Sequence, residues 1–493
     1  MIVTKSRLCK ISGFLLIYFA LVFLASLYND APYRHWQSEI HNDKAGYYIY
    51  LPSTFIHGYY FTEEMGAIRE ELHGFKYENG KMFTKYPMGV AILVLPFFLV
   101  AHIVALTGAG PANGFSAPYY EMTYFASVFY FLLGAIILYK FLRKRFSLPV
   151  TLVTLATLML ATNAFYYALR EPLFSHIYSF FLFSLLLNLT ERHWESPNIR
   201  NFSLLAVVSA LIFLVRPTNL IILPVILFLG ITSADHIRQR VKFIFNPRSL
   251  LTFIALFLLF ILPQLIYWKF LSGSFLFYSY EEEGFKYWNN PQIAKVLFSP
   301  NNGLLVYSPA YLLALAGMIL MIVKKEADRW LVPAITLVLL YMVSSWHSFH
   351  FGCSFGQRSF VEFLALFSLP MAFLFRWLLK LAYPVVASAA GLIIAYLVYV
   401  SISLSSVYPK CFEGGYWEWQ PYGYYYYQAK IFPVYQQRVV NKWTDDFEKK
   451  EGAFSRKKTV ENPLAFSGRH VSRIDSTTAY SDNFVLDLST LAK

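Results

Sequence analysis

Four basic side chains stand near prolines or glycines at the ends of apolar stretches, where ordinary loop roles explain them poorly. They are Lys85, Arg170, Arg216 and Arg358. The planar guanidinium of arginine binds a phosphate through two parallel hydrogen bonds, and a fixed cluster of cations stabilises the negative charge that grows on a departing phosphate. Together the four cations predict a binding site for a phosphate or diphosphate. In a chain this apolar, the natural phosphate belongs to a lipid.

Each arginine also has a structural alternative. Arg216 could simply extend toward the membrane surface. Arg358 could pair with Glu362 one turn later, and Arg170 could pair with its neighbour Glu171. We favour one shared role for the four cations over a set of separate structural roles.

Asp43 is the candidate base. It precedes an aromatic amphipathic stretch at 45–56, which we expect to form a short helix on the outer membrane surface. A carboxylate there can take the proton of an acceptor hydroxyl or amine as that group attacks a sugar carbon. The alternatives are an N-cap for the short helix and a structural partner for Lys44 or Arg34.

Seven further residues, which lie in short polar segments of the chain, are predicted to line the substrate pocket. They are Tyr47, Tyr86, Glu171, His176, Asn302, His347 and Gln357. The sequence has no Gly-rich phosphate loop, no Asp-x-Asp pair in the segment 29–86 and no His/Glu set with metal spacing. A solvated loop face explains the carboxylates at 281–283 better than a divalent ion does. We therefore expect no cofactor and no required metal.

The composition places these residues in a membrane protein. Of the 493 residues, 57% are hydrophobic and only 14% are charged, where a soluble domain carries roughly a quarter. Apolar runs near the ~20 residues that cross a bilayer recur along most of the chain. The net charge of +13 comes largely from basic clusters between these runs, which set topology and argue against nucleic acid as a partner.

The apolar runs predict an all-α polytopic protein of about eleven transmembrane helices. The expected spans are 11–28, 121–139, 149–167, 173–189, 202–215, 219–231, 250–268, 305–323, 331–346, 359–378 and 384–404. The stretch 87–106 is assigned to the outer leaflet, because a full crossing would put the basic cluster at 140–145 outside. The pair 202–215 and 219–231 could instead form one long kinked span.

The short basic loops place the N-terminus inside, so the polar motifs fall on the outer face of the membrane. An odd number of spans leaves the aromatic-rich tail 405–493 outside as a small appendage. Cys353 and Cys411 would share this face and could form a disulfide if it is oxidising. We expect a multi-pass protein of the cytoplasmic (inner) membrane whose site faces the periplasm or the exterior.

This layout resembles the GT-C superfamily of integral-membrane glycosyltransferases, and in particular glycosyltransferase family 39, with its protein O-mannosyltransferases and lipid A aminoarabinose transferases. Asp43 matches the catalytic acid of the first outer loop, and Lys85-Tyr86-Pro87 resembles a Lys-Pro-Pro element whose lysine meets the donor phosphate. Arg170-Glu171-Pro172-Leu173 and the segments 303–309 and 352–358 also resemble family motifs. The chain departs in having Lys44 after Asp43, Tyr86 for a proline and Glu171 for an aspartate.

The resemblance implies a GT-C-like catalytic domain over 1–404, in which 29–120 form a first outer loop with juxtamembrane helices. It implies an inverting transfer of a sugar from a polyprenyl-phosphate donor to a lipid, glycan or protein acceptor, with Asp43 as base. A lipid-linked sugar flippase or secondary transporter would also need a cationic cavity, but no base. A polymerase or ligase that uses diphosphate-linked glycans is a third possibility.

Overall fold

The computed structural model describes residues 5–29, 35–381, 383–412 and 414–431. Its contacts divide the chain into two compact units, 1–417 and 418–493. The α-helices of the first unit are α1 (Lys5–Tyr28), α2 (Asp43–Tyr48), α3 (Tyr50–Pro52), α4 (Glu63–Leu72), α5 (Gly89–Val104), α6 (Ala117–Arg143), α7 (Leu148–Leu160), α8 (Ala164–Leu169), α9 (Ser175–Glu195), α10 (Ile199–Val215), α11 (Pro224–Phe228), α12 (Ala234–Ile244), α13 (Pro247–Ser272), α14 (Ile293–Phe298), α15 (Leu304–Tyr307), α16 (Tyr311–Val323), α17 (Leu331–Ser345), α18 (Leu364–Lys380) and α19 (Pro384–Val407).

Short irregular helices and one hairpin complete this unit. They are the π-helical turns η1 (Ser53–His57) and η2 (Ala105–Ala109), the 3-10 turns η3 (Pro217–Ile222) and η4 (Arg358–Phe360), and the antiparallel strands β1 (Lys76–Glu78) and β2 (Lys81–Phe83). The second unit contributes α20 (Trp419–Gln428) to the described residues. Arg34 and the tail after position 431 lie outside the described residues.

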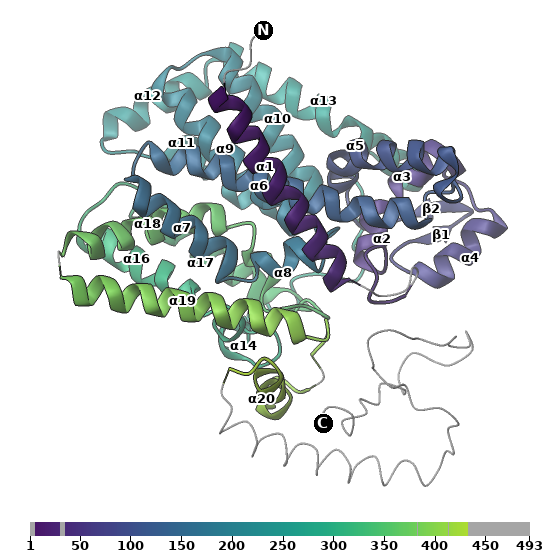
Figure 1. Ribbon diagram of the computed structural model, residues 1–493. Helices are drawn as coiled ribbons and strands as arrows, with labels where there is room; N and C mark the ends of the chain where they lie inside the picture. The colour runs from purple at the N-terminus through teal and green to yellow at the C-terminus, as the bar shows by residue number, and fades with distance from the viewer. Residues whose placement is uncertain (1–4, 30–34, 382, 413, 432–493) are drawn as a thin grey trace. The chain divides into compact units, whose positions relative to one another are not determined.

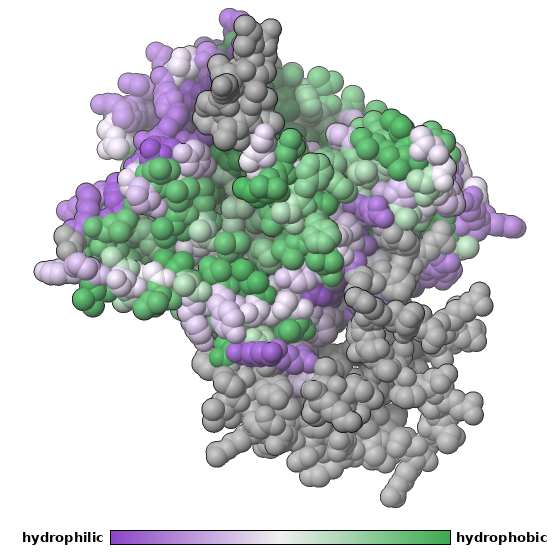
Figure 2. All heavy atoms as spheres, viewed as in Figure 1, coloured by the Kyte–Doolittle hydropathy of each residue, from purple (hydrophilic) through white to green (hydrophobic). Residues whose placement is uncertain are grey.

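The described chain is mostly helical and has the long apolar helices of a membrane protein. Four helices are long and apolar enough to cross a bilayer, namely Gly89–Ala109, Ala117–Arg143, Pro247–Ser272 and Pro384–Val407, and six shorter apolar helices accompany them. The last two long helices expose large apolar side chains such as Leu251 and Leu392, which a lipid layer accepts more readily than water. Figure 2 shows apolar surface over the middle of the first unit, between polar regions near α12 and near α4. The count of eleven crossings stays a prediction.

The helices of the first unit pack in two connected groups (Figure 1). In one group, contacts run from α13 through α10, α9 and α6 to α1, and in the other they run from α16 through α18 to α7. Contacts between α18 and α9 join the groups. The most deeply buried aromatic side chains, among them Tyr178 and Phe180 of α9, lie within this packing. These contacts, together with those of α17 to η3 and α18, hold the ends of α9, α10, α17 and α18 close enough to carry one shared site.

Two of the expected helical stretches are interrupted, one of them at a proline. Pro217 has no backbone N–H to give, and it forces Arg216 into an extended conformation, with φ −156° and ψ 116°. Helix α10 therefore ends at Val215 and the chain resumes as η3 and α11. This matches the expected junction between the stretches 202–215 and 219–231. The predicted helix 149–167 is also broken, because 161–163 bend between α7 and α8.

The segment between α1 and α6 forms the expected short helices and an unexpected hairpin. The aromatic stretch at 45–56 folds as α2, α3 and η1. Gly46 permits close contact between α2 and the residues after the hairpin, since a Cβ at this position would lie 2.4 Å from a ring carbon of Tyr86. The Thr84 hydroxyl donates to the Gly46 carbonyl at 2.9 Å, and its amide donates to the hydroxyl of Tyr267 in α13 at 3.1 Å. These contacts fix the start of α2 against the hairpin.

Candidate active site

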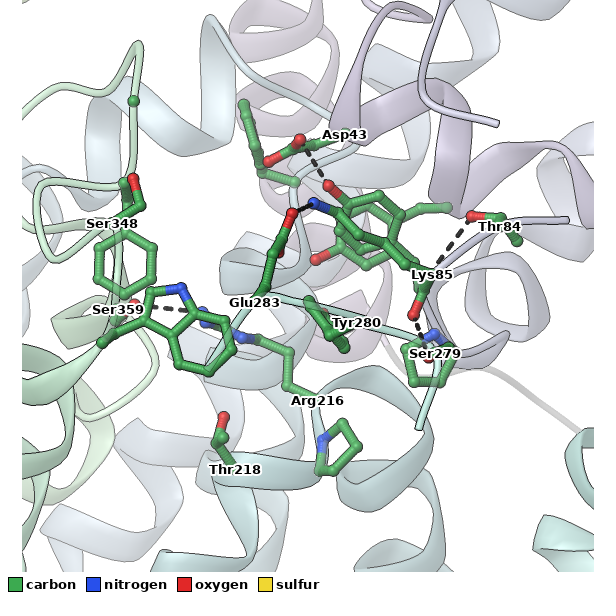
Figure 3. A pocket seen from close by; sticks show the side chains of 18 of the residues that line it. Asp43, Thr84, Lys85, Arg216, Thr218, Ser279, Tyr280, Glu283, Ser348 and Ser359 are labelled. Carbon is green, nitrogen blue, oxygen red and sulfur yellow. Dashed lines mark hydrogen bonds and ion pairs between the residues drawn. The ribbon is translucent and has the colours of Figure 1, made fainter. Parts of the chain in front are cut away.

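The predicted residues converge on a cavity of about 1250 Å³ within the first unit. Nine of the twelve line it, namely Asp43, Tyr47, Lys85, Tyr86, Glu171, His176, Arg216, His347 and Arg358. They come from the start of α2, the β2–α5 connection, the start of α9, the end of α10 and the loops around α17 and η4. Figure 3 shows several of these side chains directed toward one another. The cavity brings together segments as far apart as residues 43 and 358.

Asp43 lies at the cavity wall and is held by two donors. The Tyr86 hydroxyl donates to its Oδ1 at 2.5 Å, and Nη2 of Arg358 donates to its Oδ2 at 2.9 Å. One third of its side chain stays exposed. Burial alone would raise the pKa of Asp43, but the charge of Arg358, the Tyr86 hydrogen bond and the charge of Lys85 lower it overall. Asp43 is therefore an ionised carboxylate that faces open space.

Lys85 extends into the same space between two aromatic rings. Its Nζ lies 5.5 Å from the ring centre of Tyr86 and 5.7 Å from that of Tyr280. At its tip it donates to Oε1 of Glu283 at 2.5 Å. The Ser279 hydroxyl donates to the carbonyl of Lys85 at 2.7 Å, so the loop that carries Glu283 is attached to the lysine's own backbone. Lys85 is thus positioned to bind an anion, and the carboxylate of Glu283 already occupies this position.

Arg216 belongs to a second, more deeply buried charge cluster. Its Nη1 lies 3.3 Å from Oε1 of Glu362 and 3.3 Å from the hydroxyl of Ser359. The other oxygen of Glu362 lies 2.9 Å from Nδ1 of His176. The Glu362 side chain is only 1% exposed, so the three charged or titratable groups form one compact unit at the junction of α9, α10 and η4.

A third cluster contains two lysines that the sequence analysis did not select. Nζ of Lys44 lies 2.6 Å from Oε2 of Glu171, and Nζ of Lys410 lies 3.9 Å from Oε1 of the same carboxylate. Lys410 also donates to the Gln37 carbonyl at 2.5 Å and to Oδ1 of Asn29 at 3.2 Å. Burial lowers the pKa of Lys410 to about 8, against the opposing charge of Glu171. The cluster joins the end of α1 to the residues that begin α2 and α9.

The disulfide between Cys353 and Cys411 fixes this lysine in place. The Cα atoms of the two cysteines are 4.2 Å apart, and Cys411 directly follows Lys410. Cys353 lies in the loop that leads to Arg358. The predicted pairing is confirmed, and this cysteine pair was the sequence signal that could have pointed to Lys410.

Three predicted residues do not reach the cavity. Arg170 donates from Nη1 to the carbonyls of Ser405 at 2.6 Å and Tyr408 at 3.0 Å, so it caps the end of α19. Asn302 donates to carbonyls at 350 and 352, at 2.9 and 2.8 Å, and Gln357 donates to the carbonyl at 349 at 3.2 Å. Both side chains hydrogen-bond to backbone carbonyls of the loop at 349–358 and do not line the cavity. The structure thus gives these three residues a supporting position and not contact with the cavity.

The structural alternatives for Asp43 and two of the arginines are also corrected. Asn42, not Asp43, is the N-cap residue of α2, and no side-chain capping hydrogen bond is formed there. Arg358 pairs with Asp43, while its neighbour Glu362 is taken by Arg216. Glu171 pairs with Lys44 and Lys410, not with Arg170. In each of these ion pairs the partner is distant in sequence.

The cavity lining is balanced in charge, which the four predicted cations alone did not indicate. Its basic residues are Lys44, Lys76, Lys85, Arg216, Arg358 and Lys410, and its acidic residues are Asp43, Glu171, Glu281, Glu282, Glu283 and Glu362. Five of the six cations have a carboxylate within 3.3 Å. An anionic ligand must therefore share or displace these carboxylates. Among the described residues, no group of three or more His, Cys, Asp or Glu side chains is arranged to hold a metal ion.

The cavity also has an apolar wall on the side of α10, α13 and α17. It includes Phe213, Trp268, Leu339, Met342 and Trp346. A ligand with a charged head and a hydrocarbon chain would match both surfaces. Comparison of the chain with protein-family models, curated proteins and solved structures found no match. The function must therefore be argued from this cavity.

Proposed function

We propose that the protein is a membrane glycosyltransferase that moves a sugar from a polyprenyl-phosphate donor to an acceptor, with inversion at the anomeric carbon. The observation that carries this proposal is the convergence of Asp43, Lys85 and Arg358 on one cavity that also has an apolar wall. A base, two cations for a phosphate and a surface for a hydrocarbon chain are the parts that such a transfer requires. The resemblance to the GT-C superfamily and glycosyltransferase family 39 supports the same proposal.

In the proposed reaction, the acceptor hydroxyl or amine attacks the anomeric carbon from the face opposite the phosphate. A bond from the acceptor to this carbon forms while the bond to the phosphate oxygen breaks, and the electron pair stays on the phosphate. The acceptor proton passes to Asp43, whose low pKa keeps its carboxylate ionised and available. Lys85 and Arg358 stabilise the charge that grows on the leaving phosphate.

Arg358 has a special place in this proposal because it already binds Asp43. One nitrogen, Nη2, contacts the carboxylate at 2.9 Å. The other N–H groups of a guanidinium form a planar fork that can hold a phosphate at the same time. Arg358 would thus fix the distance between the base and the leaving group. Such prior alignment supplies a large part of the rate gain in group transfer.

The disulfide supports a site on an oxidising face of the membrane, since disulfides persist in oxidising compartments. Cys353 is itself part of the cavity lining. The basic residues of α12, among them Arg238 and Lys242, would then lie on the inner side. We therefore propose the outer face of the cytoplasmic membrane as the place of reaction.

The test is sugar transfer by purified protein in liposomes, with a panel of polyprenyl-phosphate sugars, extracted envelope acceptors and EDTA. Asp43→Asn should lower the rate about 10²- to 10⁴-fold, the range for loss of a general base. Asp235→Asn is the matched control, because Asp235 is exposed on α12 and, among the described residues, pairs with Arg238 of the same helix. If the wild type binds phosphate-linked donors, transfers no sugar and moves lipid independently of Asp43, the protein is a carrier instead.

A further inference from the structure

Glu283 occupies the tip of Lys85, the place where the proposed function puts a donor phosphate. The distance between Nζ of Lys85 and Oε1 of Glu283 is 2.5 Å, and both side chains are about one third exposed, at 31% and 32%. An ion pair with this exposure is screened by water and gains little free energy, typically below about 1 kcal/mol. A phosphate that enters the cavity can therefore replace the carboxylate at low cost.

The loop around Glu283 is anchored on both sides of this residue, so the carboxylate stays near Lys85. Ser279 binds the Lys85 carbonyl, and the Tyr278 hydroxyl donates to the carbonyl of Glu283 at 2.7 Å. On the other side, the His347 amide donates to the carbonyl of Gly284 at 2.8 Å. Tyr280 packs edge-on against Tyr86 and against Trp346. A displaced Glu283 therefore remains available to return.

We propose that Glu283 is a competing internal ligand of Lys85 that exchanges with the phosphate of the lipid and so determines how strongly lipid phosphates are held. This inference rests on the proposed function and adds a residue to it. Before binding, the carboxylate keeps Lys85 neutralised in a partly apolar cavity. After transfer, the same carboxylate competes with the phosphate product and weakens its hold. Glu283 is a specificity-determining residue and takes no part in bond making.

The neighbouring carboxylates behave differently. Glu281 pairs with Lys76, which also pairs with Glu78, each at 2.6 Å. Glu282 makes no ion pair or hydrogen bond with the described residues, although it lies beside Glu283 in the same loop and also lines the cavity. Removal of its charge changes the net charge of the loop by the same amount and leaves Lys85 paired. Glu282 is therefore a matched control for general electrostatic attraction.

The experiment measures binding of farnesyl phosphate to the purified full chain in detergent, with uncharged farnesol as a second probe. Glu283→Gln should bind farnesyl phosphate about fivefold more tightly than the wild type, since loss of a weak ion pair is worth a factor of this size. Glu282→Gln should stay within about twofold of the wild type. Farnesol should bind all three proteins alike, because it carries no charge to exchange.

A Lys85→Met background completes the test, since Glu283→Gln should have no further effect once its partner is gone. Equal affinities of the Glu283→Gln and Glu282→Gln variants, in a wild type that binds the phosphate through Lys85, would overturn this inference and leave the proposed function standing. If the wild type binds farnesyl phosphate no better than farnesol, and Lys85→Met changes nothing, the phosphate site itself is wrong and both proposals fall.

Discussion

The cavity has two sides whose ion pairs differ in exposure. On the first side, the carboxylates of Asp43 and Glu283 are 33% and 32% exposed and pair with Arg358 and Lys85. On the second side, the carboxylates of Glu171 and Glu362 are only 8% and 1% exposed. We call these the open side and the buried side. Both sides pair carboxylates with lysine and arginine.

Because of this contrast in exposure, the role of a charged residue depends on what its removal leaves behind. On the buried side, loss of one partner strands a charge away from water, which is strongly destabilising. On the open side, water or a ligand can replace the partner. The buried side therefore maintains the shape of the cavity, and the open side is free to exchange partners with a substrate.

The largest effect on stability is expected from Glu362→Gln. This change leaves Arg216 and His176 without their carboxylate and should cost about 3–5 kcal/mol, the range for a broken buried pair. Unfolding of the detergent-solubilised protein by heat or denaturant measures it. The open-side variant Glu283→Gln should change stability by less than about 1 kcal/mol. Equal losses of stability in the two variants would contradict the distinction between the open side and the buried side.

Lys410 provides a pH-dependent test of the buried side. Its pKa in the folded protein is about 8, below its ordinary value of 10.5, so between these values the unfolded chain binds the extra proton. Stability should therefore rise with pH through this window. Transfer activity should fall severalfold as Lys410 loses the charge that helps to hold Glu171. The difference between wild type and Lys410→Met isolates both trends, and parallel pH profiles for the two proteins would contradict them.

The smallest effect is expected for Lys76→Met at the rim of the open side. The side chains of Lys76 and Glu281 are 39% and 51% exposed, so their pair should contribute no more than about 1 kcal/mol. Transfer activity should stay within about twofold of the wild type. A loss of tenfold or more would show that the open side extends further than the pair of Lys85 and Glu283.

Several open-side residues were predictable because their motifs are unusual for a membrane loop. Asp43, Lys85 and Arg358 each stand out by type and position, and all three reach the cavity. Their partners were not predictable, since pairs such as Asp43 with Arg358 join residues 315 positions apart. The apolar runs indicated where helices lie, but not the direction of loop side chains. For this reason Arg170 was assigned to the cavity although it contacts the end of α19.

The carboxylate run at 281–283 is the opposite case to Arg170. The sequence predicts that the run is a solvated loop, and the structure brings one of its residues to a predicted site residue. As a sequence it is typical of a solvated loop, and Glu281 and Glu282 fit that description. Glu283 does not, because the loop returns to the β2–α5 connection and brings this one residue to Lys85. The local composition of such a run describes its three residues together. It does not show which one of them contacts a residue that is distant in sequence.

The disulfide has a consequence for biogenesis. Cys353 precedes α18 and Cys411 follows α19, and the two cysteines are 58 positions apart in the sequence. The bond can form only after the ribosome has synthesised α18 and α19. Cys353 therefore has no disulfide with Cys411 while these helices are made. Because Lys410 directly precedes Cys411 and Cys353 lies in the loop that leads to Arg358, the bond joins two segments of the cavity wall. Oxidation therefore follows the synthesis of α18 and α19, and a chain that ends before position 411 keeps Cys353 as a free thiol.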